Sequence, residues 1–354
     1  MVKDIRLAII GIGNCASNLV QGLFFYKNKP LSVHNDIGGY KITNIKPVAA
    51  IDVAANKVGK DLGEAIFAKP NNTDVICKVP KLKVPVKKGP VLDGVGEYMK
   101  QMVSMDTKPP ANIAELLKEN KVDVVLNFLP VGSYEATRYY AGEAIKAGCG
   151  FVNAIPEFIA SEKEWEKKFN KAGLPIIGDD TKAQIGATIV HRVLTNLCME
   201  RGAKIDRAYQ INVGGNSDFY NMLERSRLKS KKISKTEAVQ SQLTSRLSDE
   251  NLHIGPSDYV PWLNSRKLAF MRIEGRLFGD IPFSIDVRLD VEDKANSSGV
   301  VIDAIRCCKL AMDRNVGGAL IAPSAYFCKH PPQQYPDSVA KQMLEEFISG
   351  QRER

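Results

Sequence analysis

Short apolar runs alternate with helical patterns through the first half of the chain. Residues 5–10 form an apolar run, and Leu19, Val20, Leu23 and Phe24 then recur at helical spacing. The same alternation continues downstream and predicts parallel βαβ units in a doubly wound α/β sheet of the Rossmann type. The expected strands span residues 5–10, 47–51, 122–128, 151–154 and 174–178; one expected helix follows residues 11–17, and others span 134–147, 162–171 and 186–201.

The pattern changes after Gly202, where strand signals follow one another without crossover helices. Residues 283–291 alternate strictly between apolar and polar side chains, which indicates an antiparallel strand with one buried face. Residues 268–277 are its expected hairpin partner. Two further helices, over 299–314 and 337–348, are expected to return to the first domain. We therefore predict a first domain of residues 1–201 completed by 299–354, with 202–298 inserted as a smaller α+β domain.

Composition adds mainly exclusions. The 354 residues are 44% hydrophobic and 25% charged, which excludes a disordered or collagen-like chain. The seven cysteines contain no C-x-x-C pair, so we expect free thiols in a reducing cytoplasm. Too few apolar residues precede Gly11 for a signal peptide, and no apolar run approaches the ~20 residues of a membrane span. A cytoplasmic protein without membrane association is expected.

The formal charge of +9 comes largely from two basic clusters. Neither cluster contains an aromatic residue on which bases could stack, so nucleic acid is not the expected partner. A phosphorylated small molecule accounts for the charge equally well. The clusters consist of Lys78, Lys81, Lys83, Lys87 and Lys88, and of Arg225, Arg227, Lys229, Lys231, Lys232 and Lys235.

A glycine-rich segment directly follows the first expected strand and opens a helix. It reads G-x-G-x-x-A and supplies Gly11, Gly13, Asn14, Cys15 and Ala16 as candidate cofactor contacts. In this context the segment predicts a dinucleotide site, because glycines let a pyrophosphate approach the helix N-terminus. Asp52 ends the second strand and would bind the adenosine ribose, which favours NAD over NADP. It lies about 40 residues after Gly11, where ~20 is usual, so we expect residues 27–40 to be a surface insertion.

Polar residues also stand at later strand ends. Asn127 and Asn153 each follow an apolar strand, although a turn-forming role is the alternative for both. Asp179, Asp180 and Lys182 precede a helix opening at Gly186, Ala187 and Thr188, a pattern that could bind a polyol hydroxyl and a phosphate. Helix capping by the acidic pair is the alternative.

Lys231 and Lys235 are four residues apart and would share one face of a helix. Neighbouring ammonium groups lower each other's pKa, which suits lysine to proton transfer near neutral pH. A simple solvated face is the alternative. The four histidines form no metal pattern, and His191 is expected to pack inside a helix.

With these residues the chain resembles the myo-inositol-1-phosphate synthase family, in its shorter prokaryotic form. The resemblance spans nearly the whole chain. It rests on 11–17 (GIGNCAS), 71–73 (NNT), 89–94 (GPVLDG), 129–133 (LPVGS, with Pro130 beside the cofactor), 178–180 (GDD), 212–216 (NVGGN), 230–235 (SKKISK) and 253–258 (HIGPSD).

The resemblance implies conversion of D-glucose 6-phosphate to 1L-myo-inositol 1-phosphate with a tightly held NAD and no net redox change. The implied steps are oxidation at C5, enolisation at C6, aldol closure onto C1 and return of the hydride. It also implies an NAD-binding first domain, a catalytic and oligomerisation domain, and a homotetramer.

Individual residues acquire roles through the same resemblance. Lys231 would polarise and protonate the C5 oxygen, Lys235 and Lys267 would serve the ring-closure oxygens and phosphate, and Lys329 the C1 aldehyde. The matching acids Asp180 and Asp218 would orient hydroxyls and lysines, and Asp293 would face the nicotinamide. Lys182, Gly186, Ala187 and Thr188 would bind the substrate phosphate, although a two-residue insertion in this loop departs from the family pattern.

Two points stay open at this level. Carboxylates such as Asp293 could bind a divalent or monovalent cation, or only form hydrogen bonds. Two other functions share the expected fold: an ordinary NAD-dependent dehydrogenase of a phosphorylated sugar or semialdehyde, and a non-catalytic NAD-binding regulator.

Overall fold

A parallel sheet of seven strands forms the larger half of the computed structural model, which describes residues 4–30 and 34–354. Its strand order is β11-β6-β5-β4-β1-β2-β3, and every pairing is parallel. The doubly wound fold predicted from the apolar runs is confirmed. The strands are β1 (Ile5–Ile10), β2 (Ile45–Asp52), β3 (Val86–Lys88), β4 (Val124–Asn127), β5 (Gly150–Asn153), β6 (Pro175–Ile177) and β11 (Gly318–Ala319).

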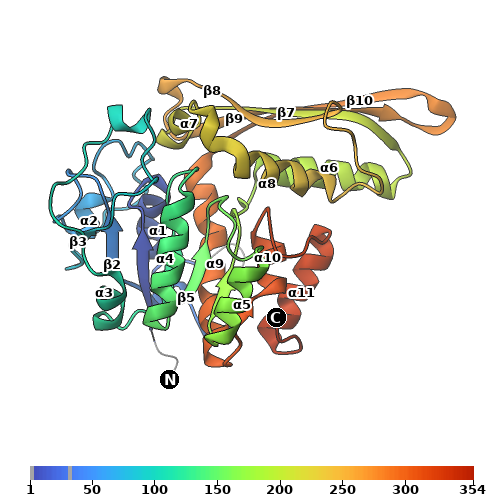
Figure 1. The fold of residues 1–354 in the computed structure, drawn as a ribbon. Coiled ribbons are helices and arrows are strands. Elements are labelled where there is room, and N and C mark those ends of the chain that lie inside the picture. Colours follow the sequence, from blue (N-terminus) through green and yellow to red (C-terminus); the bar gives the residue numbers. More distant parts are fainter. Residues whose placement is uncertain (1–3, 31–33) are drawn as a thin grey trace.

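Helices cover both faces of this sheet (Figure 1). One face packs against α1, α9, α10 and α11, and the other against α3, α4 and α5. Burial on both faces explains why strands such as β4 are continuously apolar. The helices are α1 (Asn14–Phe25), α2 (Leu62–Ala65), α3 (Ile113–Glu119), α4 (Tyr134–Ala147), α5 (Lys163–Lys171), α9 (Asp293–Asp313), α10 (Ile321–Phe327) and α11 (Asp337–Ser349).

A second sheet of four strands, in the order β10-β9-β7-β8, extends beside the first (Figure 1). Its buried face packs against α6 and α8. On this face, Ala269 and Met271 contact the Ala187 side chain. The expected hairpin of residues 268–277 and 283–291 is present as β9 and β10. These elements are α6 (Ala187–Glu200), β7 (Lys204–Gly214), α7 (Ser217–Asn221), α8 (Lys229–Gln240), β8 (Leu252–Tyr259), β9 (Arg266–Arg276) and β10 (Pro282–Glu292).

Two sequence expectations for this region are wrong. Strands β7 and β8 pair in parallel, and α7 and α8 lie in the connection between them, so a crossover is present after all. The helix expected from residue 299 begins at Asp293, because the Glu292 side chain caps it by accepting a hydrogen bond from the Ala295 backbone. The helix therefore starts six residues earlier than expected.

Residues 27–40 are not simply a surface insertion. Residues 31–33 lie outside the described part of the chain, but Ile37 and Tyr40 are buried in the core beside α9. The fully buried Arg306 of α9 donates to the carbonyl oxygens of His34 and Tyr40. The second half of the segment thus belongs to the packed structure.

Arg192 joins elements from both halves of the molecule. Its side chain on α6 is completely buried and donates to the carbonyl oxygens of Ala238 on α8 (2.6 Å) and Tyr335 (2.9 Å). Its Nε also pairs with Asp337 of α11 at 3.0 Å. Because a buried cation must be fully paired, this contact holds α6, α8 and α11 in one arrangement.

Replacing Arg192 should therefore destabilise the fold. We expect Arg192→Met to lower the free energy of unfolding by about 3 kcal/mol, because buried acceptors lose their partner. Urea unfolding measures the change. The control is Arg207→Met, whose ion pair with Glu274 lies on the surface and should contribute less than ~1 kcal/mol. Equal effects of the two substitutions would contradict a bracing role for Arg192.

Candidate active site

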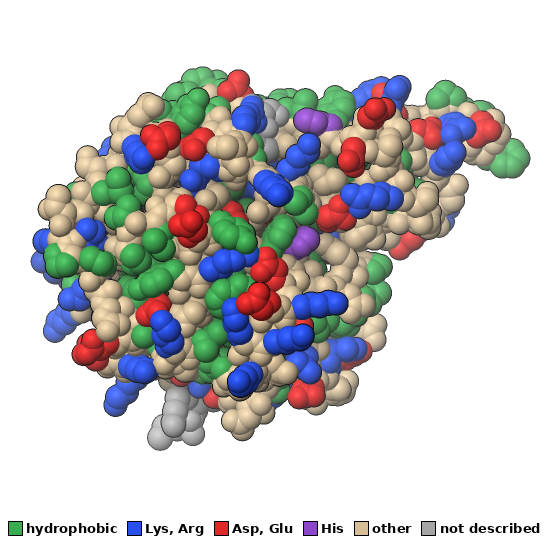
Figure 2. Space-filling view, in the orientation of Figure 1, with side chains coloured by type: hydrophobic (Ala, Val, Ile, Leu, Met, Phe, Trp, Pro, Cys, Tyr) green, Lys and Arg blue, Asp and Glu red, His purple; other side chains and the backbone are tan. Residues whose placement is uncertain are grey.

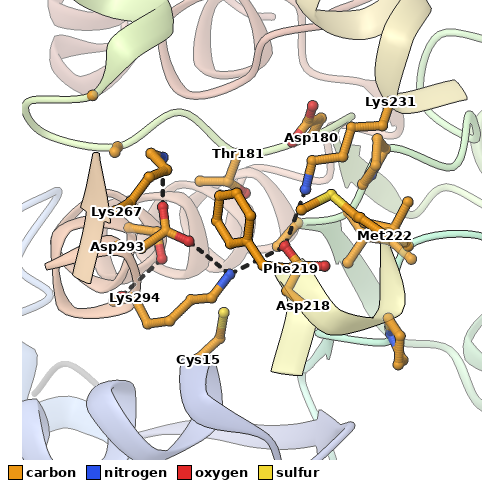
Figure 3. Close-up of a pocket in the computed structure, with 18 of the residues that line it drawn as sticks. Cys15, Asp180, Thr181, Asp218, Phe219, Met222, Lys231, Lys267, Asp293 and Lys294 are labelled. Carbon is orange, nitrogen blue, oxygen red and sulfur yellow. Dashed lines mark hydrogen bonds and ion pairs between the residues drawn. The ribbon is translucent and has the colours of Figure 1, made fainter. Parts of the chain in front are cut away.

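A cavity of about 200 Å³ lies between the two sheets, at the carboxyl ends of the parallel strands. Its wall combines the loops after β1, β4 and β6 with the first turns of α6 and α9 and one side of α8. Ligands of doubly wound sheets bind at this edge, because the strand ends and helix N-termini converge there. The close-up in Figure 3 shows lysine and aspartate side chains directed toward one another across this space.

The glycine-rich loop leaves room for a ligand beside the N-terminus of α1. Gly11 has φ +85°, and a Cβ there would lie 2.7 Å from the Phe128 carbonyl oxygen, so only glycine fits. A Cβ at Gly13, in contrast, would meet no atom of the described residues within 4 Å. Asn14 and Cys15 line the cavity, whereas Ala16 is fully buried behind them. Open space beside unpaired helix N–H groups fits a pyrophosphate.

A neighbouring loop holds the glycine-rich segment in place. The Asn72 backbone donates to Asn14 Oδ1 at 2.9 Å, and Asn72 Nδ2 reaches the Gly215 carbonyl at 3.1 Å. Asn71 Nδ2 donates to the Ile12 carbonyl oxygen. Residues 71–73, one of the segments that carried the resemblance, thus support the loop rather than line the cavity floor.

A second hollow, of about 120 Å³, continues from the same loop toward Asp52. Gly13 and Pro130 line both hollows, so one elongated ligand could occupy them together. The Asp52 carboxylate accepts backbone hydrogen bonds from Ile12 (2.8 Å) and from Val53 (2.7 Å). These contacts fix the carboxylate at the strand end, where a ribose of a bound dinucleotide would lie.

A continuous chain of ion pairs crosses the cavity wall (Figure 3). Lys267 contacts Asp293 at 2.5 Å, and Lys294 lies 3.0 Å from the same carboxylate. Lys294 also lies 3.3 Å from Asp218, which Lys231 contacts at 3.1 Å. Although burial acts to raise them, these ammonium groups hold the pKa values of Asp218 and Asp293 below their usual range. Both carboxylates therefore remain charged.

Lys235 differs from the other lysines because its proton is weakly held. Burial lowers its pKa well below the usual value, and the ammonium groups of Lys231, Lys267 and Lys329 lower it further. The side chain lies one helical turn after Lys231 on α8, as the spacing predicted. A lysine with a lowered pKa accepts and releases a proton more readily near neutral pH. Its side chain is buried, so the interpretation of this helix face as solvated does not hold.

Asp180 joins the two halves of the site. Its Oδ1 accepts from Lys329 at 2.8 Å, and its Oδ2 accepts from Ser234 of α8 at 2.6 Å. Burial acts to raise its pKa, but Lys329 and Lys231 lower it below the usual value. The six predicted catalytic residues, Lys231, Lys235, Lys267, Lys329, Asp180 and Asp218, all line the one cavity.

The first turn of α6 faces the cavity beside these lysines. Gly186, Ala187 and Thr188 line the wall, and Gly186, the N-cap residue, has no side chain with which to cap the first N–H groups of this 14-residue helix. A helix N-terminus with uncapped N–H groups binds anions such as phosphate. The geometry thus brings three of the four predicted phosphate contacts together.

Lys182, the fourth, is directed elsewhere. Its side chain is buried, and Nζ donates to the Ala325 carbonyl and pairs with Asp337 at 2.8 Å. Burial lowers its pKa to about 8, with a further contribution from Arg192. The expected phosphate contact of Lys182 is wrong, because its side chain pairs with Asp337, the same acid that pairs with Arg192.

Three predicted cofactor contacts form a buried chain beneath the strand ends instead. Asn127 Nδ2 donates to Asn153 Oδ1 at 2.9 Å, and Asn153 Nδ2 donates to Asp179 at 2.7 Å. Asp179 is fully buried and also accepts from the Ser161 hydroxyl and backbone. Burial raises its pKa to about 6. None of the three lines either hollow, so the structure gives them a supporting position under the loops.

Sequence reasoning missed Lys294. It is the second residue of α9, and it was overlooked because the helix was expected to begin at residue 299. The signal that could have located the start of this helix is Glu292, an acidic residue directly before Asp293. The Glu292 side chain caps the helix, and Asp293 and Lys294 in its first turn line the cavity.

Histidines contribute no metal site. His191 is fully buried within α6, as predicted, and burial lowers its pKa to about 4. Within residues 4–30 and 34–354, no cluster of three or more His, Cys, Asp or Glu side chains could hold a metal ion.

Comparisons with known proteins agree on one family. The family model described as myo-inositol-1-phosphate synthase matches residues 186–294. An inositol-3-phosphate synthase of Mycolicibacterium smegmatis is 53% identical over 357 residues, which cover 98% of each chain. The inositol-3-phosphate synthase of Mycobacterium tuberculosis H37Rv is 52% identical over 98% of this chain and 96% of its own.

A solved structure extends the comparison to the fold. A myo-inositol-1-phosphate synthase-related protein from Thermotoga maritima superposes with a TM-score of 0.82 and covers 98% of each chain. At 23% identity, this likeness concerns the fold alone.

The open space at Gly13 makes a specific prediction. Gly13→Val should fill that space and weaken NAD binding at least about tenfold, while leaving the fold intact, because its backbone φ of −91° suits any residue. Calorimetric titration with NAD measures the effect. The control is Gly142→Val, another site where a Cβ meets open space but remote from the cavity. Unchanged affinity of Gly13→Val would disprove the pyrophosphate position.

Proposed function

The chain belongs to the myo-inositol-1-phosphate synthase family, as the sequence predicted, and we propose that it converts D-glucose 6-phosphate to 1L-myo-inositol 1-phosphate. The product is the same compound as 1D-myo-inositol 3-phosphate. The observation that carries the proposal is the gathering of all six matching lysines and aspartates around one cavity, beside a glycine-rich loop with room for a dinucleotide.

NAD is the proposed cofactor. Gly13, Asn14 and Cys15 would contact its pyrophosphate end, and Asp52 would bind the adenosine ribose in the adjoining hollow. Bound NAD would take a hydride from C5 of the sugar and return it after ring closure. Asp293 lies in the first turn of α9 and would face the nicotinamide.

Lys231 is the proposed group that polarises and protonates the C5 oxygen. Its ammonium contacts Asp218 at 3.1 Å, so the carboxylate fixes the direction of the lysine side chain. The ammonium can protonate the C5 oxygen during reduction, and the amine of Lys235, with its lowered pKa, can take the hydroxyl proton during oxidation. Positive charge at this point also stabilises the oxyanion that forms at C5 during enolisation.

Ring closure needs proton transfer and positive charge at other oxygens. Lys235 offers an amine with a lowered pKa, and Lys267 an ammonium paired with Asp293. Lys329, held by Asp180, would polarise the C1 aldehyde. The alkoxide formed by aldol closure is thereby stabilised by groups already in position.

The substrate phosphate would bind at the first turn of α6. The backbone N–H groups near Gly186, Ala187 and Thr188 supply donors there. A wall with more lysines than carboxylates also attracts a phosphate dianion, and Lys231 and Lys235 of the second basic cluster belong to this wall.

A homotetramer is the proposed assembly, formed through the four-stranded sheet. Tyr209 and Phe270 are exposed on the face that α6 and α8 leave open, and Phe278 at the β9–β10 turn is 98% exposed. The hairpin that carries Phe278 projects from the body of the molecule (Figure 1). Large exposed aromatic side chains favour association with another copy.

A cytoplasmic location is proposed from the seven free cysteines. Among the described residues, no helix is long and apolar enough to cross a membrane. On the face drawn in Figure 2, lysine and arginine alternate with acidic side chains, so no continuous basic field marks a nucleic-acid site there.

The weakly held proton of Lys235 predicts a pH dependence. Acidification should protonate this amine and lower kcat/KM, because the amine is neutral only at a pH above its lowered pKa. Lys235→Arg, which cannot deprotonate, should lose about 10²- to 10⁴-fold in kcat. The control is Lys232→Arg, an exposed neighbour on the same helix. A Lys235→Arg enzyme with normal turnover would refute the proton-transfer role.

The internal redox cycle can be tested with limiting NAD. Carbon NMR of labelled glucose 6-phosphate should show an inositol phosphate formed over many turnovers per NAD, while the absorbance of NADH stays flat. Stoichiometric NADH with an open-chain or lactone product would instead identify an ordinary dehydrogenase. Absence of any reaction, with nucleic-acid binding that weakens as salt rises, would favour a regulator.

A further inference from the structure

Lys294 bridges two carboxylates that could otherwise bind a cation. Its Nζ lies 3.0 Å from Asp293 Oδ2 and 3.3 Å from Asp218 Oδ2, so a single ammonium group contacts both. The side chains of Lys294 and Asp293 are each 12% exposed. In Figure 3 the ammonium lies between the two carboxylates, on the side of Cys15 and the first turn of α1. The ammonium thus occupies the place where a bridging ion would lie.

The position of Lys294 is set by the carboxylates and not by its helix. It belongs to the first turn of α9, where the helix dipole disfavours a positive charge. Glu292 caps the same turn and also accepts from Ser265, so the backbone that carries Lys294 is anchored to β9. A lysine held at an unfavourable helix end by two partly buried acids acts as a fixed charge.

The donor set around these acids does not fit an inorganic cation. Asp293 contacts the ammonium groups of Lys267 and Lys294, and Asp218 contacts those of Lys231 and Lys294. Three positive groups thus surround two carboxylates and would repel an added cation. Mg²⁺ and Ca²⁺ also require at least about six oxygen ligands, whereas Asp218 Oδ2 and Asp293 Oδ1 already accept hydrogen bonds from lysines.

We propose that the Lys294 ammonium is a built-in cation, which replaces a divalent or monovalent ion between Asp218 and Asp293. The enzyme accordingly needs no added cation for turnover and binds none at this position. Lys294 is a positioning residue: it fixes Asp218, which orients Lys231, and Asp293, which orients Lys267. The turnover part of this inference rests on the proposed synthase function, whereas the binding part does not.

Cation binding to the intact wild-type protein is the first test. Mn²⁺ serves as the probe, and electron paramagnetic resonance measures the free ion during titration. The expected result is no stoichiometric Mn²⁺ site in the wild type. Stoichiometric binding that the Asp293→Asn variant loses would overturn the proposal, whatever the protein's activity.

Turnover and melting after removal of the lysine are the second test. In tetramethylammonium chloride with chelator, the wild type should keep its rate, whereas Lys294→Ala should fall at least about tenfold. Ammonium chloride at equal ionic strength should restore part of that rate and raise the melting temperature of Lys294→Ala only, because the ion fills the vacated position. Lys232→Ala, an exposed lysine outside the cavity, is the matched control and should behave as wild type.

Two results would contradict the proposal in this second test. One is a wild-type enzyme that loses its rate when small cations are removed. The other is Lys294→Ala with full rate and no response to ammonium. If Lys294→Ala does not fold, Lys294→Met, a longer neutral variant, takes its place. The wild-type measurements test the proposal without any variant. If no inositol phosphate forms, the proposed function is refuted instead. The Mn²⁺ titration and the melting temperatures then still test whether Lys294 takes the place of a cation.

Discussion

Five lysines and three aspartates share the wall of one cavity, and this imbalance of buried charge sets the properties of the site. Each carboxylate contacts at least one ammonium group, and Asp218 and Asp293 contact two. The excess positive charge attracts an anionic substrate. It also lowers the pKa of Lys235, the lysine that burial and three ammonium neighbours disfavour most in its charged form. Substrate attraction and the proposed proton transfer by Lys235 thus have the same electrostatic origin.

The fold brings these charges together from segments far apart in the chain. Asp180 follows β6 of the large sheet, Lys231 and Lys235 come from α8, Lys267 from β9, and Asp293 from the first turn of α9. Outside the cavity, the buried Arg192 of α6 holds α8 against α6 and α11 through Ala238 and Asp337. Since these contacts use no group from the cavity wall, the cavity lysines are left to pair with the cavity aspartates.

Local sequence patterns predicted much of this arrangement. The apolar strands, the glycine-rich turn and the i, i+4 spacing of Lys231 and Lys235 depend on neighbouring residues, and the structure has each of them as expected. The failures arise from long-range contacts. Asp337, over 150 positions away in the chain, pairs with Lys182 and keeps its side chain out of the cavity. The buried position of Asp179 depends on residues 153–161. Lys294 was missed because a side-chain cap moved the start of α9.

In the proposed reaction, oxidation and reduction occur at the same carbon within one closed cycle. Glucose 6-phosphate carrying deuterium on C5 tests it most directly, because hydride removed from C5 and returned there stays within the molecule. The account predicts an inositol phosphate that retains the deuterium on the carbon derived from C5, with none released into free NADH. Deuterium in released NADH, or a product that has lost it to water, would contradict the account.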